Sequence, residues 1–134
     1  MEDKRTVKRH GIYGEHRPVT GEVAALLHVV SKGGLRLEKL LSRAVPRGEV
    51  HEIILVDEDL KPGDEVKGFA PIAFFEVEEG GLIVVGDQVS VNGVDVGTVA
   101  GFDLNHAPNH MNIMVKADSL RGHDVMLGYK IKIG

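Results

Sequence analysis

The chain contains no cysteine and no tryptophan, and aromatic residues make up only 4% of its 134 residues. The absence of cysteine excludes disulfide bonds, a thiolate nucleophile and cysteine-ligated zinc. Scarce aromatic side chains leave few stacking platforms for single-stranded nucleic acids or sugars. No apolar run approaches the roughly 20 residues that a membrane helix needs, and the charged start, Met1-Glu2-Asp3-Lys4-Arg5, does not match a secretory signal. We therefore expect a cytoplasmic protein that does not bind membranes.

Charge is distributed unevenly along the chain. Residues 1–50 carry ten Lys or Arg and six Asp or Glu, a net charge of +4, whereas residues 51–134 carry six and fourteen, a net charge of −8. The acidic half argues against a general nucleic-acid surface, because such binding depends on neutralising phosphates. Two oppositely charged faces that attract each other, within the fold or across a homo-oligomer, explain the pattern more simply.

Residues 1–134 are expected to form a single domain, because this length can bury a core without disulfides or metals. Residues 1–18 show little periodicity and predict a loosely held N-terminal arm. Residues 19–134 contain many short strand-like runs separated by turns, which is typical of a mainly β fold, a small closed or partly open β-barrel. Asn92-Gly93 is the strongest hairpin signal, because a type I′ turn needs positive φ at both central residues.

One segment departs from this pattern and predicts a short α-helix over residues 35–45. Apolar side chains recur there at spacings of three and four residues, which places them on one helix face: Leu37, Leu40, Leu41 and Ala44. Pro46 and Gly48 would end the helix. Because so short a helix must pack against a sheet, we expect it to plug one end of the barrel.

The densest group of polar side chains lies in residues 101–112, between two strand-like runs. Such a patch favours a loop shaped for a ligand over a simple connection. A carboxylate and two imidazoles form a set suited to a divalent metal such as zinc, nickel, iron or manganese: Asp103, His106 and His110. Nearby carboxamides are candidates for contacts to an organic ligand: Asn105, Asn109 and Asn112.

Other interpretations of this loop stay open. Pro108 lies between the two histidines and excludes the interior of a zincin-type helix, so a turn is expected there. Asp and Asn in such a segment also bind nearby backbone, so a purely structural loop is an equal alternative. We expect Asp103 within hydrogen-bond reach of His106 or His110, which could then act as a general base. Catalytic residues are not assigned, and the sequence leaves open whether the protein is an enzyme.

The remaining histidines carry weaker signals. His51-Glu52 opens a strand-like run and is expected to be a solvated pair, although a histidine and an acid from another strand could complete a metal site. His28 lies in an apolar run and is expected to be a hydrogen-bonded core histidine. His16 and His123 lie in charged or glycine-rich stretches and indicate little.

Residues 63–66 and 86–89 share the pattern Gly-Asp-polar-Val. These turns resemble those of small swapped-hairpin and cradle-loop barrels, a group that includes archaeal CTP-dependent riboflavin kinases. The likeness extends to Gly-Glu-Val at 21–23, a helix after the first strands and the closing segment from Leu120-Arg121 to Ile133. It implies a cradle-loop topology and, remotely, a nucleotide- or flavin-related enzyme. Where those kinases carry a glycine-rich nucleotide loop, this chain has Leu26-Leu27-His28-Val29-Val30.

Two main function hypotheses follow. The first is a barrel protein that binds a small ligand or a divalent metal, the only cofactor indicated, at residues 103–112. The second is a structural or assembly module without a small-molecule site, in which the loop shapes a subunit contact in a homo-oligomer. Neither hypothesis includes a nucleic-acid partner.

Overall fold

The structure, a computed structural model, describes residues 13–134, and all regular secondary structure in this range is β. The described range contains ten strands: β1 (Val19–Leu26), β2 (Ser31–Arg36), β3 (Ser42–Val45), β4 (Val50–Val56), β5 (Glu65–Glu79), β6 (Gly81–Val84), β7 (Gln88–Val91), β8 (Val94–Asp103), β9 (Asn112–Lys116) and β10 (Lys130–Ile133). None of these residues forms a helix that is long and apolar enough to cross a membrane.

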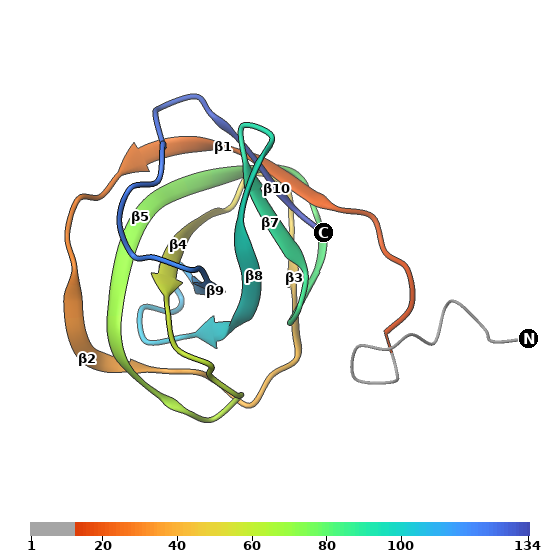
Figure 1. Ribbon diagram of the computed structural model, residues 1–134. Helices are drawn as coiled ribbons and strands as arrows, with labels where there is room; N and C mark the ends of the chain where they lie inside the picture. Colours follow the sequence, from red (N-terminus) through yellow and green to blue (C-terminus); the bar gives the residue numbers. More distant parts are fainter. Residues whose placement is uncertain (1–12) are drawn as a thin grey trace, which may run out of the picture.

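Within the described chain, seven strands form a ring-like sheet (Figure 1). Their order is β1-β10-β7-β8-β9-β4-β5, and β5 pairs again with β1. Neighbours are antiparallel except β4 and β9, which are parallel. β2 pairs with the first part of β5, whereas β3 pairs with β6 in a separate two-stranded sheet. The predicted mainly β class is confirmed.

The described residues form two hydrophobic cores, one inside the ring and one on its outer face. Along β4 the side chains alternate, so that Ile53 and Leu55 belong to the inner core while Ile54 and Val56 belong to the outer one. Leu35 on β2 packs into the outer core. Because β4 is buried on both faces, its sequence is a continuous apolar run rather than an alternating one.

The predicted hairpin at Asn92-Gly93 is present. Asn92 has φ of 51° and Gly93 has φ of 82°, and Val91 pairs with Val94 across the turn. Positive φ at both central residues is the requirement of a type I′ turn. This local signal therefore placed β7 and β8 correctly.

The predicted α-helix at residues 35–45 is wrong. The chain there is extended, with Leu35 and Leu37 two residues apart on one buried face and Arg36 exposed between them. The backbone there forms hydrogen bonds with segments distant in the sequence. Leu37 N–H donates to Asp64 O at 2.9 Å, and Glu38 N–H donates to Phe102 O at 2.8 Å. Residues 42–45 then form β3. Tertiary hydrogen bonds and burial thus override the helical spacing of the leucines.

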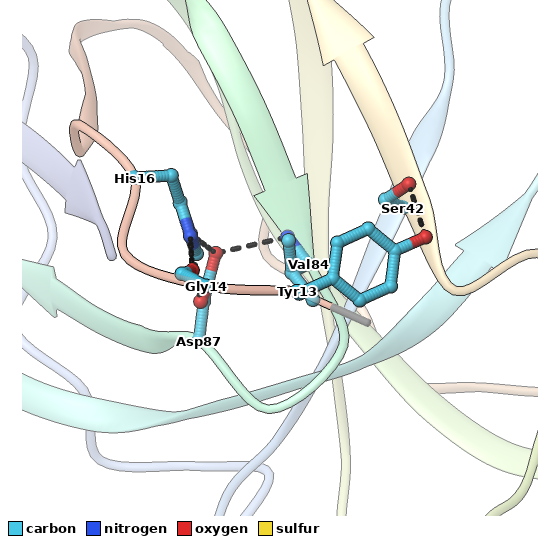
Figure 2. Close-up of polar contacts among 6 residues, drawn as sticks. All are labelled: Tyr13, Gly14, His16, Ser42, Val84 and Asp87. Atoms are coloured by element: carbon cyan, nitrogen blue, oxygen red, sulfur yellow. Dashed lines mark hydrogen bonds and ion pairs between the residues drawn. The ribbon is translucent and has the colours of Figure 1, made fainter. Parts of the chain in front are cut away.

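Residues 13–18 precede β1 and contact two other parts of the fold through side chains (Figure 2). The Tyr13 hydroxyl lies 2.8 Å from Ser42 Oγ on β3. His16 reaches Asp87, which follows β6. Residues 1–12 of the predicted arm lie outside the described residues.

The contact between His16 and Asp87 is a buried polar pair. His16 Nε2 lies 2.9 and 3.1 Å from the two carboxylate oxygens, and its Nδ1 lies 3.2 Å from Gly14 O. The side chain of Asp87 is 1% exposed, and it also accepts a hydrogen bond from Val84 N–H at 2.9 Å. Both ring nitrogens of His16 face acceptors, so the geometry suits an imidazolium paired with a carboxylate. His16, which the sequence did not single out, therefore helps to fix the start of β1.

Closure of the ring depends on a close approach between β1 and β5. A Cβ added to Gly21 would lie 2.5 Å from Glu76 O and 2.6 Å from a ring carbon of Phe75. Only a residue without a side chain fits this position. Gly68, also in a strand, has no such neighbour, since the nearest atom to an added Cβ is 4.0 Å away.

Gly21→Ala is expected to lower the free energy of unfolding by about 2 kcal/mol, the typical effect of overpacking. Gly68→Ala is the matched control and should change it by less than about 0.5 kcal/mol. Chemical denaturation of the two variants measures both values. Equal stability of the Gly21→Ala and natural proteins would contradict the close contact between β1 and β5.

Asp87→Asn and His16→Gln should each lower the free energy of unfolding by about 3 kcal/mol, because breaking a buried ion pair strands the remaining partner. The double variant should lose clearly less than the sum of the two losses, since the two residues interact directly. Asp95→Asn, on an exposed part of β8, should stay within about 0.5 kcal/mol of the natural protein. Strictly additive losses in denaturation experiments would argue against the pairing.

Candidate functional site

The loop with the predicted site residues connects β8 to β9. His106 O accepts hydrogen bonds from Asn109 N–H at 2.9 Å and from His110 N–H at 3.3 Å. The chain therefore turns between the two histidines, as Pro108 predicts. This turn brings the imidazoles together, with ring centres 5.1 Å apart and planes inclined by 23°.

Asp103 lies at the base of this loop and is buried. Its carboxylate accepts hydrogen bonds from the backbone N–H of Arg36 and of Asn105, both at 2.9 Å, and from Asn112 Nδ2 at 3.1 Å. Among the described residues no hydrogen bond joins it to an imidazole, so the expected contact with His106 or His110 is not formed. Asp103 instead ties β8 to β9 and to the end of β2.

His110 is held by two side chains. Its Nε2 lies 2.9 Å from Glu52 Oε1 on β4, and its Nδ1 lies 2.9 Å from Asn109 Nδ2. Because an amide nitrogen can only donate, Nδ1 accepts and Nε2 carries the proton that is donated to Glu52. The edge of the ring packs against Phe74 on β5, with ring centres 5.0 Å apart. The side chains of His110 and Glu52 are each only 10% exposed, so this pair belongs to the fold's interior.

His51 and Glu52 are buried, and the expectation of a solvated pair is wrong. His51 Nδ1 accepts a hydrogen bond from Met111 N–H at 3.0 Å, and its Nε2 lies 2.8 Å from Glu49 Oε1. Both residues belong to β4, which lies between β5 and β9. Polar side chains at the start of a central strand need partners, and the loop before β9 supplies them. The continuous apolar run that follows Glu52 was the signal that this strand is central.

The predicted ligand residues do not converge on one point. Asn105, His106 and Asn109 are exposed, whereas Asn112 is buried and its Oδ1 has no hydrogen-bond partner among the described residues. No group of three or more His, Asp or Glu side chains in residues 13–134 is arranged to hold a metal ion. Metal binding by Asp103, His106 and His110 stays a prediction.

A cavity of about 260 Å³ lies elsewhere, between the end of β1, the middle of β5 and the segment that joins β9 to β10. In Figure 1 this joining segment, in dark blue, crosses β5 in the view. Nine of the thirteen residues that line the cavity have apolar side chains, among them Leu26, Ala70, Ile72 and Val125, while polar atoms form the larger part of its exposed wall. Among the described residues that line it, the polar side chains are those of His28, Arg121 and His123, and none is a carboxylate.

His28 is exposed at this cavity, so the expectation of a core histidine is wrong. β1 ends at Leu26 and the apolar run continues into the connection to β2. The apolar residues of that connection face the cavity instead of the ring's interior. The apolar run at residues 26–30, which the sequence suggested to be part of a strand, therefore lines the cavity.

Hydrogen bonds fix the segment that forms one wall of the cavity. Gly128 N–H donates to Val23 O at 3.0 Å, and Val23 N–H donates to Tyr129 O at 2.9 Å. The Tyr129 hydroxyl donates to Asp124 Oδ2 at 3.3 Å. Desolvation and the neighbouring Asp124 carboxylate raise the pKa of this hydroxyl. The segment that supplies this wall is thus anchored to β1 just after the lining residues.

The fold and these sites define a small mainly β protein with a ring-like sheet and a cavity at one end of β1. The chain belongs to a family of unknown function, DUF6917, whose model matches residues 13–134. No curated protein and no solved structure matches the chain. The family match coincides with the described residues, so the ring, the loop and the cavity all lie within the family's domain.

The metal hypothesis requires about one equivalent of metal per chain in protein purified without a histidine tag. Because Asp103 and His110 already hold protein partners, we expect elemental analysis to find no stoichiometric metal. The melting temperature should also stay unchanged when zinc, nickel or manganese is added. Stoichiometric metal that is lost in both His106→Ala and His110→Ala would establish the predicted triad instead.

Proposed function

We propose that this protein binds a small organic molecule in the cavity beside β1 and β5, and that the ring is a small closed β-barrel. The observation that carries the proposal is the set of residues around the cavity, in which nine apolar side chains accompany the three polar side chains of His28, Arg121 and His123. Small-molecule sites typically have this composition. The cavity of about 260 Å³ is slightly smaller than the sites of drug-sized ligands, so the expected ligand is small.

The position of the cavity supports the barrel interpretation. Ala70 is part of the core inside the ring, and Leu26, Ile72 and Val125 pack against that core. The cavity therefore adjoins the filled interior at one end of the ring. In barrels of about eight strands side chains fill the interior, and ligands commonly enter at the mouth.

The loop at residues 103–112 supports ligand binding less well. The acceptors of Asp103 and both ring nitrogens of His110 are used in bonds that hold the loop to β2 and β4. His106 keeps an exposed ring, but it stacks on a neighbour that is itself fully engaged. These contacts favour a structural role for the loop, which the sequence had left as an equal alternative.

The shape of β2 weakens the alternative of an assembly module. β2 is the last strand of its sheet and has one unpaired edge among the described strands. Its pairing with β5 shifts register between Lys32 and Leu35, where Gly33 and Gly34 have positive φ of 68° and 85°. Such a bulge bends an edge strand and hinders pairing with another chain.

A titration of the natural protein with cyclohexanol, followed by amide NMR, tests the proposal. This probe is small, apolar and uncharged, and we expect saturable shifts at residues 26–30, 70–72 and 120–125. Amides of residues 103–112 should not move, since they lie outside the cavity lining. Val30→Phe places a large ring at an exposed position of the lining and should abolish the saturable shifts.

Ala44→Phe is the matched control, because Ala44 is exposed on β3 and does not line the cavity. It should bind cyclohexanol like the natural protein. Thermal melting of both variants distinguishes a filled cavity from a loss of folding. Saturable shifts at residues 103–112, or shifts that Val30→Phe leaves unchanged, would overturn the cavity as the binding site.

A further inference from the structure

We infer that the ligand of this cavity is a small organic anion, with its charged group at Arg121 and its apolar body against β1 and β5. The inference rests on the proposed function, since it concerns the same cavity. It depends on the charge of the lining, on the hydrogen-bond donors at one edge and on the apolar walls opposite them.

Arg121 lines the cavity with a guanidinium that has no hydrogen bond or ion pair to any residue from 13 to 134. Only its backbone N–H is engaged, with Ser119 Oγ at 3.1 Å. Of the five other cations in residues 51–134, two pair with acids: Lys116 lies 3.2 Å from Asp59, and Lys130 lies 3.0 Å from Glu78. A guanidinium presents five donors and no acceptor, so it favours an anionic partner.

The backbone next to Arg121 adds donors of the same kind. Neither the N–H of Gly122 nor that of His123 donates a hydrogen bond to a described residue, and both residues line the cavity. Gly122 has φ of 83°, and a Cβ added there would meet no atom within 4 Å. This stretch of backbone is therefore open, and the positive φ accounts for the glycine.

No group in the described lining opposes a negative charge. Its remaining titratable side chains are His28 and His123, which are neutral or positive but never negative. His123 Nε2 lies 2.7 Å from Ser119 O, so this nitrogen donates. Residues 51–134 carry fourteen acids against six basic residues, yet no acid lines the cavity. The lining is thus positive within an otherwise acidic part of the chain.

The opposite wall argues against a purely inorganic anion. Leu26, Ala70 and Ile72 offer only apolar contacts from their side chains, and burial of an apolar body against them is favourable in proportion to its area. Phosphate or sulfate alone would leave this wall without a partner. An alkyl or aryl group that carries one carboxylate or a comparable anionic group would satisfy both walls.

The test compares cyclohexanecarboxylate with its neutral amide, cyclohexanecarboxamide, in amide NMR titrations of the natural protein. We expect the carboxylate to bind roughly tenfold more tightly, the gain expected from one charge-assisted hydrogen bond. Arg121→Gln should remove this preference and leave the affinity for the amide unchanged. Added salt should weaken binding of the carboxylate only.

Arg47→Gln is the matched control, because Arg47 is exposed and does not line the cavity. It should keep the tenfold preference, and an equal loss in this variant would overturn the role of Arg121. If both probes bind equally in the natural protein, or if cyclohexylmethylammonium binds best, the inference fails while the proposed function stands. If no probe binds at residues 26–30, 70–72 and 120–125, the proposed function fails as well.

Discussion

The pairing of β1 with both β5 and β10 is the interaction on which the rest of this structure depends. It converts a row of strands into a ring and leaves neither β1 nor β5 with an open edge along the paired residues. The missing side chain of Gly21 allows the two strands to approach, because a Cβ there would meet the backbone of Glu76. Because paired edges cannot accept another strand, this contact also shields the paired stretches of β1 and β5 from other chains.

The same closure creates the cavity. β1 runs beside β5 as far as Leu26, where its pairing with Ala73 ends. The chain then leaves the sheet, and residues 26–30 form a wall above the ring's interior. The segment between β9 and β10 is anchored to β1 through Val23 and supplies the opposite wall. The position of the cavity is thus set by the end of β1 at Leu26 and by the segment between β9 and β10 that bonds to β1.

The polar loop before β9 has a different physical origin. β4 and β9 are buried, so polar residues at their ends must find partners inside the protein. Glu52 pairs with His110, His51 accepts from the backbone of Met111, and Asp103 accepts from Asn112. The buried part of the polar segment, Asp103, His110 and Asn112, thus meets the hydrogen-bonding needs of a buried junction.

Local signals in the sequence predicted what depends on local chemistry. The Asn92-Gly93 hairpin and the mainly β class both follow from turn preferences and short periodicity. The helix at 35–45 was wrong because Leu37 and Glu38 bond to chain that is far away in the sequence. The burial of Glu52 depends in the same way on strands that are distant in the sequence.

The cavity could not be predicted from the sequence, because it too depends on segments that are far apart in the chain. Its lining comes from residues near 28, near 71 and near 122, and no local pattern connects these segments. His28 and Arg121 each carried little meaning alone, and only the ring brings them to the same surface. The acidic bias of the second half of the chain also concealed a cationic lining, because net charge says nothing about where charges gather.

The central claim is that the ring of this protein carries a ligand site at the end where β1 leaves β5. A crystal structure of the protein soaked with a collection of small organic fragments tests it most directly. The account predicts that fragment density is enclosed by residues 26–30, 70–72 and 120–125, with acidic fragments oriented toward Arg121. Fragments bound only at residues 103–112, or a cavity closed by its own side chains in the crystal, would contradict it.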